Sequence, residues 1–144
     1  VPTPIGWVLM VRAFETWTHT DDIRRALGHQ MQPPPPPSLR TMSRSACALM
    51  PLMLAARGQP RTGEVVRVRF TDIVDTAWDV DLGEIGVAHV ARTNRVDAEI
   101  TLDAVDLCRA IGNRMPEGGL AYTSIGDADL ARTVIEAAPA LAVL

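Results

Sequence analysis

The sequence EVVRVRFTDIVDTAWDVDL, at residues 64–82, sets the class of fold. Apolar residues alternate with arginines from 66 to 70, and with aspartates from 78 to 82. Such alternation is typical of strands that bury one face and expose the other. We therefore expect two half-buried strands here and two further strands at residues 87–91 and 96–102. The apolar faces of these strands need a cover of other elements.

Helical segments flank the strands and can supply that cover. The first is a long segment that ends at Gly28, a residue suited to a left-handed helix cap. The second begins with Ser38 as its cap, ends before Gly58, and should kink near Met50 because Pro51 follows. The expected helices are residues 5–27, 38–57, 103–114 and 128–138, with a last strand at 120–125. The predicted fold class is α+β, with a mostly antiparallel sheet covered by helices and preceded by one long helix.

Five consecutive prolines at residues 33–37 mark the clearest boundary in the chain. Such a run favours a stiff polyproline II spacer. We predict three parts: residues 1–32 with the long helix, the proline linker 33–37, and an α+β domain at 38–144. The first helix has no partner helices before the linker. Either it packs on the following domain, or it is the last helix of a bundle whose other helices lie outside this chain.

Composition and charge exclude several classes of partner. The chain has 144 residues and a net charge of -3, so it lacks the basic field that nucleic-acid and anionic-membrane binding require. No apolar run is long enough to span a membrane, and no secretory signal begins the chain. We expect a soluble cytoplasmic protein that binds neither nucleic acid nor membranes. Because every basic residue is arginine, any cationic site must be built from guanidinium groups.

Glu15, His19 and Asp22 project from one side of the predicted first helix, because residues three and four apart share a helix face. A carboxylate and an imidazole four residues apart can chelate Zn²⁺ or a similar divalent cation. Asp22 would be a further ligand or the acceptor for the ring N–H of the histidine. The alternative is a solvated surface pair.

Three runs of sequence carry a family resemblance. They are ETWTHTDDIRRALG at residues 15–28, AEITLDAVDLCRAIGNR at 98–114 and SIGDADLARTVIEAAPAL at 124–141, with the proline linker after the first. Together they resemble the actinobacterial mycothiol-dependent maleylpyruvate isomerase family. Its members join a DinB-like four-helix metal-binding bundle to a C-terminal domain similar to sterol carrier protein. Only the last bundle helix and the C-terminal portion have counterparts here.

The resemblance implies a site. Glu15 and His19 match the family's metal ligands, with zinc the expected metal and mycothiol the thiol cofactor. Arg114 matches a catalytic arginine better than Arg109 does, and would bind the carboxylate of a small substrate. The family's other metal-binding histidine has no counterpart, so a second copy of the chain or a bundle-bearing partner would supply it. The implied function is that of the C-terminal part of a metal- and mycothiol-dependent isomerase or transferase.

A second hypothesis is non-catalytic. Met42, Met50 and Met53 make the second helix rich in methionine, a side chain that adapts to varied ligands and surfaces. This pattern is compatible with an α+β module that binds a small apolar ligand or a partner protein, although methionines also simply fill cores. A third alternative is a truncated relative without activity.

Overall fold

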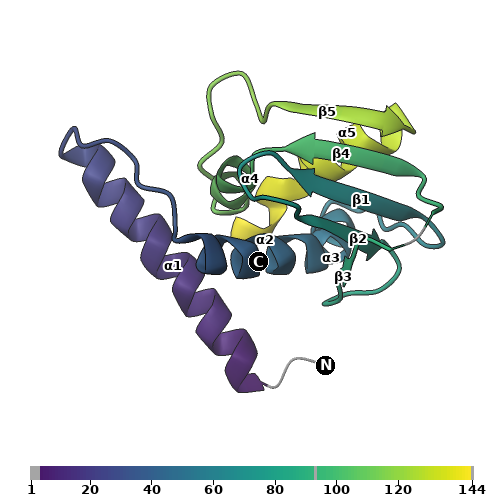
Figure 1. The fold of residues 1–144 in the computed structure, drawn as a ribbon, viewed down its shortest axis with the longest axis horizontal. Coiled ribbons are helices and arrows are strands. Elements are labelled where there is room, and N and C mark those ends of the chain that lie inside the picture. Colours follow the sequence, from purple (N-terminus) through teal and green to yellow (C-terminus); the bar gives the residue numbers. More distant parts are fainter. Residues whose placement is uncertain (1–3, 93, 144) are drawn as a thin grey trace.

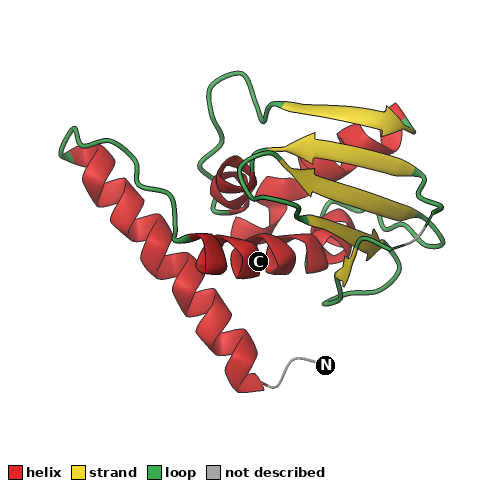
Figure 2. Ribbon diagram, in the orientation of Figure 1, coloured by secondary structure: helices red, strands yellow, loops and turns green. Residues whose placement is uncertain are grey.

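The computed structural model describes residues 4–92 and 94–143, and it confirms the α+β class (Figures 1 and 2). Helices cover one face of a single sheet, and one long helix lies outside this pair of layers. The helices are α1 (Pro4–Ala26), α2 (Pro36–Ala48), α3 (Met50–Ala56), α4 (Ala104–Ile111), α5 (Ala128–Ala137) and the 3₁₀ helix η1 (Ala138–Val143). The strands are β1 (Val65–Phe70), β2 (Ala77–Asp81), β3 (His89–Val90), β4 (Ala98–Leu102) and β5 (Tyr122–Gly126).

The sheet has the strand order β3-β2-β1-β4-β5. Central strand β1 pairs with β2 antiparallel, with Val68 opposite Trp78, and with β4 parallel, with Val68 opposite Ile100. The β2–β3 and β4–β5 pairs are antiparallel. The prediction of a mostly antiparallel sheet is therefore confirmed, with one parallel pair at its centre.

The alternation seen in the sequence matches the two faces of the sheet. Val66, Val68 and Ile100 are fully buried under the helices. On the other face, Arg67 donates to Asp79 with an Nε–Oδ1 distance of 2.7 Å. Ion pairs of this kind satisfy polar groups on a sheet face that no helix covers.

Two helix boundaries differ by two residues or more from the sequence prediction, and one predicted kink is present. Helix α2 begins at Pro36 rather than after Ser38, because proline is tolerated in the first helical turn, where its missing N–H costs nothing. The predicted kink near Met50 is present as a break at Leu49 between α2 and α3. Helix α4 ends at Ile111 rather than at residue 114, because Asn113 adopts a left-handed backbone with φ 58°.

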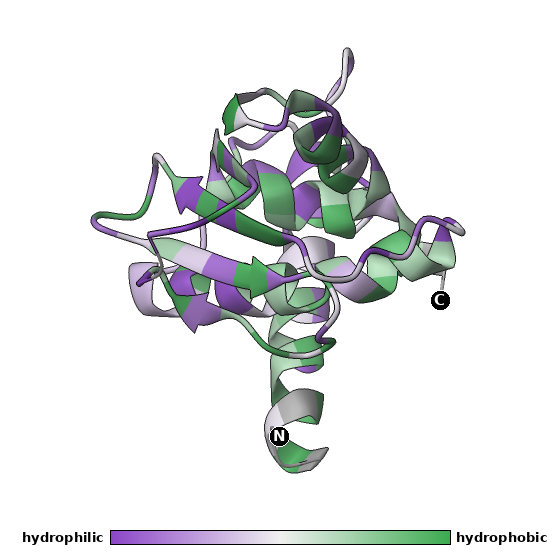
Figure 3. Cartoon of the chain, turned by 90° about the vertical axis from the view of Figure 1, so that its right-hand side faces the viewer, coloured by the Kyte–Doolittle hydropathy of each residue, from purple (hydrophilic) through white to green (hydrophobic). Residues whose placement is uncertain are grey.

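Helix α1 packs on the domain along one side and projects away from it (Figure 3). Phe14 and Trp17 pack against the core, and Asp21 is only 3% exposed. Helical spacing predicts one apolar side that joins Phe14 and Trp17 with Ile5, Val8, Leu9, Ile23 and Leu27, and this prediction is wrong, because the latter five are between 56% and 73% exposed. Among the described residues, no helix is both long enough and apolar enough to cross a membrane.

Gly126 joins β5 to α5 at a point that only glycine fits. Its φ is 90°, and a Cβ there would lie 2.5 Å from the carbonyl oxygen of Asp97. We expect Gly126→Ala to lower the free energy of unfolding by about 2 to 4 kcal/mol, from the left-handed backbone and the clash together. Gly58→Ala is the control, because Gly58 has φ 70° but nothing within 4 Å, so it should cost about 1 to 2 kcal/mol. Equal losses in urea unfolding would contradict the clash.

Candidate functional site

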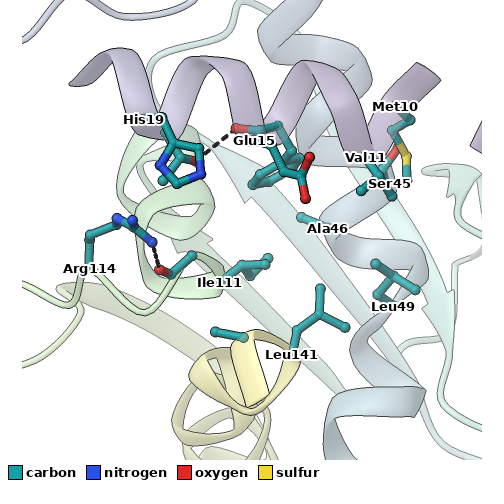
Figure 4. Close-up of a pocket in the computed structure, with 14 residues that line it drawn as sticks. Met10, Val11, Glu15, His19, Ser45, Ala46, Leu49, Ile111, Arg114 and Leu141 are labelled. Atoms are coloured by element: carbon teal, nitrogen blue, oxygen red, sulfur yellow. Dashed lines mark hydrogen bonds between the residues drawn. The ribbon is translucent and has the colours of Figure 1, made fainter. Parts of the chain in front are cut away.

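A hollow of about 440 Å³ lies between α1, α2, the end of α4 and η1 (Figure 4). Glu15, His19 and Arg114 all line it, so the structure brings together three of the residues that the sequence singled out, whereas Asp22 is not among its described lining residues. In Figure 4 their side chains lie around the same space. The other lining residues are Met10, Val11, Phe14, Thr18, Ser45, Ala46, Leu49, Ile111, Gly112, Leu141 and Ala142.

The wall of this hollow is mostly apolar. Phe14 comes from α1, Leu49 from the α2–α3 break, Ile111 from the last turn of α4, and Leu141 from η1. Polar and charged side chains gather where α1 faces the end of α4. The hollow is therefore amphipathic, with an apolar wall and a polar end.

Glu15 and His19 lie one turn apart on α1, and both side chains are largely exposed. The Nδ1 atom of His19 is 3.9 Å from Oδ2 of Asp22, which is too long for a hydrogen bond. Asp22 thus does not act as the acceptor for the ring N–H in this conformation. The metal-binding role of Glu15 and His19 stays a prediction.

Arg114 is positioned by the way α4 ends. Asn113 donates its backbone N–H to the Ala110 carbonyl, and Arg114 donates its own to the Arg109 carbonyl, so the chain reverses in a Schellman turn. This turn directs the Arg114 side chain toward α1.

The guanidinium of Arg114 forms a bidentate pair with Asp22. Its Nε is 3.1 Å from Oδ1, its Nη2 is 2.6 Å from Oδ2, and its Nη1 donates to the Gly112 carbonyl. Hydrogen bonds from Arg114 hold the pKa of the Asp22 carboxyl below its usual value. The family resemblance assigns the Arg114 guanidinium to a substrate carboxylate. In the structure this guanidinium already pairs with the carboxylate of Asp22. The catalytic role of Arg114 remains a prediction.

A second acid–arginine pair lies beside the first. The Nε atom of Arg109 is 3.7 Å from Oδ2 of buried Asp21, and Arg109 Nη1 contacts the sulfur of Met31 at 3.8 Å. Within the described residues, Asp21 Oδ1 and Arg109 Nε have no hydrogen-bond partner. We call Asp21, Asp22, Arg109 and Arg114 the acid–arginine clasp. Its partners are 88 and 92 residues apart in the chain, and no sequence pattern pointed to the pairing.

Other groups that could carry chemistry were also located. Within residues 4–92 and 94–143, no group of three or more His, Cys, Asp or Glu side chains is arranged to hold a metal ion. Cys47 and Cys108 are free and fully buried, and burial raises the pKa of both thiols. Neither cysteine therefore presents a thiolate to the hollow.

Comparison with known proteins assigns no family to the chain. No protein-family model matches the chain. No curated protein matches it either. A solved structure described as "UbiJ-SCP2 Ubiquinone synthesis protein" is similar to it at 17% identity with a TM-score of 0.45, covering 74% of this chain and 93% of that one. Membership of the mycothiol-dependent isomerase family thus stays a prediction from the sequence.

The Asp22–Arg114 pair should make the free energy of unfolding depend on pH in the acid range. Because the folded-state pKa of Asp22 is lowered, this pair stabilises the fold above the carboxyl's ordinary value near 3.8 and is lost as pH falls through the folded value. We expect Asp22→Asn to lower the free energy of unfolding at pH 7 by about 1 kcal/mol or less. The decline below about pH 5 should also become shallower than in the parent protein.

Urea unfolding between pH 2.5 and 7 measures this effect. Asp129→Asn is the matched control, because Asp129 pairs with Arg132 on an exposed helix surface. If both variants follow the same acid slope as the parent, the Asp22–Arg114 pair does not contribute to the acid sensitivity.

Proposed function

We propose that this chain binds a small apolar or amphipathic molecule in the hollow beneath α1. The observation that carries the proposal is the apolar wall of a concave space of about 440 Å³, with polar groups at one end. Ligand sites are typically concave, mostly apolar, and oriented by a few polar groups. The proposal favours the non-catalytic alternative of the two functions considered from the sequence.

The four elements that frame the hollow differ in how firmly they are held. Ala46, Leu49 and Ile111 belong to the buried core, so this side of the hollow is preformed. On the α1 side, Val11 and Glu15 are exposed. A ligand that covers about 300 Å² of apolar surface would gain about 7 kcal/mol from burial, before the costs of association. A free energy of about 7 kcal/mol corresponds to a Kd of about 10 μM, and this is the upper limit of the affinity because the costs of association reduce it.

Filling the hollow should weaken binding without a change in the buried core. Ala142 lines the hollow and is exposed, so Ala142→Trp places an indole in the space that a ligand would occupy. We expect at least a tenfold loss of affinity for the neutral fluorescent probe N-phenyl-1-naphthylamine, measured by fluorescence titration. Ala121→Trp, at an exposed position outside the lining, should bind the probe like the parent. Equal binding by all three proteins would rule out this hollow as the site.

A second candidate function is metal-dependent thiol chemistry, because Glu15, His19 and Arg114 line the same hollow. Zinc, when bound, lowers the pKa of a coordinated thiol such as mycothiol and so favours its thiolate. Glu15 and His19 would hold the metal, with remaining ligands from a second copy or a bundle-bearing partner. Arg114 would orient a small carboxylate substrate only after release from Asp22. This candidate rests on the sequence resemblance together with the shared hollow.

Zinc affinity tests this candidate directly. We expect His19→Ala and Glu15→Ala each to weaken Zn²⁺ binding about tenfold or more, measured by competition with a chromophoric chelator. His29→Ala should match the parent, because exposed His29 lies outside the hollow. Zinc binding that is lost equally in the His29 variant would contradict a site at Glu15 and His19.

A further inference from the structure

A second hollow, of about 620 Å³, lies on the other side of the contact between α1 and α2. Its far wall is the segment before β3, residues 86–88, together with Trp78 of β2. Met10 and Ser45 line both hollows, so these two residues lie at the boundary between them. The remaining lining residues of the second hollow are Gly6, Arg40, Thr41, Arg44 and Ala48.

The second hollow is cationic, although the chain as a whole has a net charge of -3. Arg40 and Arg44 lie four residues apart on α2 and therefore on one side of the helix. No aspartate or glutamate is among its described lining residues. The hollow thus combines two guanidinium groups with apolar walls, and no carboxylate there competes for the arginines.

Arg44 is held in place before any ligand arrives. Its Nε donates to the carbonyl of Ala88 at 3.1 Å, and its guanidinium carbon lies 5.5 Å from the centre of the Trp78 ring. Trp78 in turn donates its ring N–H to the hydroxyl of Ser43 at 3.3 Å. Side chains fixed in this way lose little entropy when they bind an anion.

Both arginines keep hydrogen-bond donors for a ligand. Within the described part of the chain, Arg40 donates Nη2 to the carbonyl of Val74 at 3.3 Å, and Arg44 donates Nε to the carbonyl of Ala88. A guanidinium has five N–H donors, and each of these contacts uses one. The contacts are to backbone carbonyls, which carry no net charge, and among the described residues no carboxylate lies within ion-pair distance of either arginine. The nearest acidic surroundings are on the far side of Arg44, which also lines a third hollow with Asp79, Asp81 and Glu84.

We propose that the two hollows form one elongated site for an amphipathic organic anion. Its anionic group binds Arg40 and Arg44, and its chain passes Met10 into the apolar hollow lined by Leu49 and Leu141. The flexible side chain of Met10 suits a wall shared by both hollows. This inference rests on the proposed function and adds the chemical class of the ligand, a chain with an acidic end group.

Competition with N-phenyl-1-naphthylamine tests the inference, with decanoate and decanol as matched ligands of equal chain length. We expect decanoate to bind at least tenfold more tightly than decanol to the full chain. Raising NaCl from 0.05 to 0.5 M should weaken decanoate and leave decanol unchanged. Decyl phosphate, run in parallel, distinguishes a fatty carboxylate from a phosphate monoester as the end group.

Variants locate the anion. Arg44→Gln and Arg40→Gln should each remove most of the preference for decanoate over decanol, and Arg44→Lys should restore part of it. Arg132→Gln removes one positive charge on the exposed surface of α5, so it should keep the full preference. Thermal unfolding of each variant checks that the fold is intact. Arg40 is exposed and, among residues 4–92 and 94–143, donates to the Val74 carbonyl alone, so its variant tests the inference even if Arg44→Gln unfolds.

The outcomes separate the two proposals. Equal affinity for decanoate and decanol in the parent protein would overturn the anionic site and leave the apolar site standing. A preference for decanoate that survives in both arginine variants would overturn its location. Decanoate binding that is unaffected by Ala142→Trp would show that the hollows are not one site. If neither ligand nor the probe binds, both proposals fail.

Discussion

The acid–arginine clasp between α1 and the end of α4 is the contact on which the candidate site depends. Asp21 is almost fully buried, and a carboxylate in that position is tolerated only beside a positive charge. Arg109 supplies that charge, while Arg114 holds the neighbouring Asp22 in a bidentate pair. Because two adjacent aspartates are fixed, the orientation of α1 about its own axis is fixed too. In this orientation Glu15 and His19 face the hollow.

The acid–arginine clasp also explains why the buried side of α1 could not be predicted from the sequence. Alternation predicted β1, β2 and β4, and Gly28 and Gly58 predicted the ends of α1 and α3, because these signals act within a few residues. The buried side of α1 could not be predicted. Its exposed Ile5 and Leu27 are as apolar as its packed Phe14, and the deciding aspartates look like ordinary surface residues until their arginine partners are known.

Only part of the candidate site could be predicted from the sequence. Helical spacing placed Glu15 and His19 on one side of α1, and both do line the hollow. Leu141 and Met10 were not predicted, because they reach the hollow through contacts between distant segments. The turn at Asn113, which positions Arg114, was missed because asparagine adopts a left-handed backbone only in some contexts. Residues that share one helix face could be predicted from the sequence, whereas contacts between distant helices could not.

The arrangement of arginines decides which of the two hollows suits an anion. An anion that binds Arg114 must first displace Asp22, which gives up two charge-assisted hydrogen bonds and leaves a carboxylate unpaired. An anion that binds Arg44 displaces no carboxylate, because that side chain is held by a carbonyl and an aromatic ring. Charge therefore favours the second hollow for the acidic end of a ligand. The apolar wall of the first hollow is left for its chain.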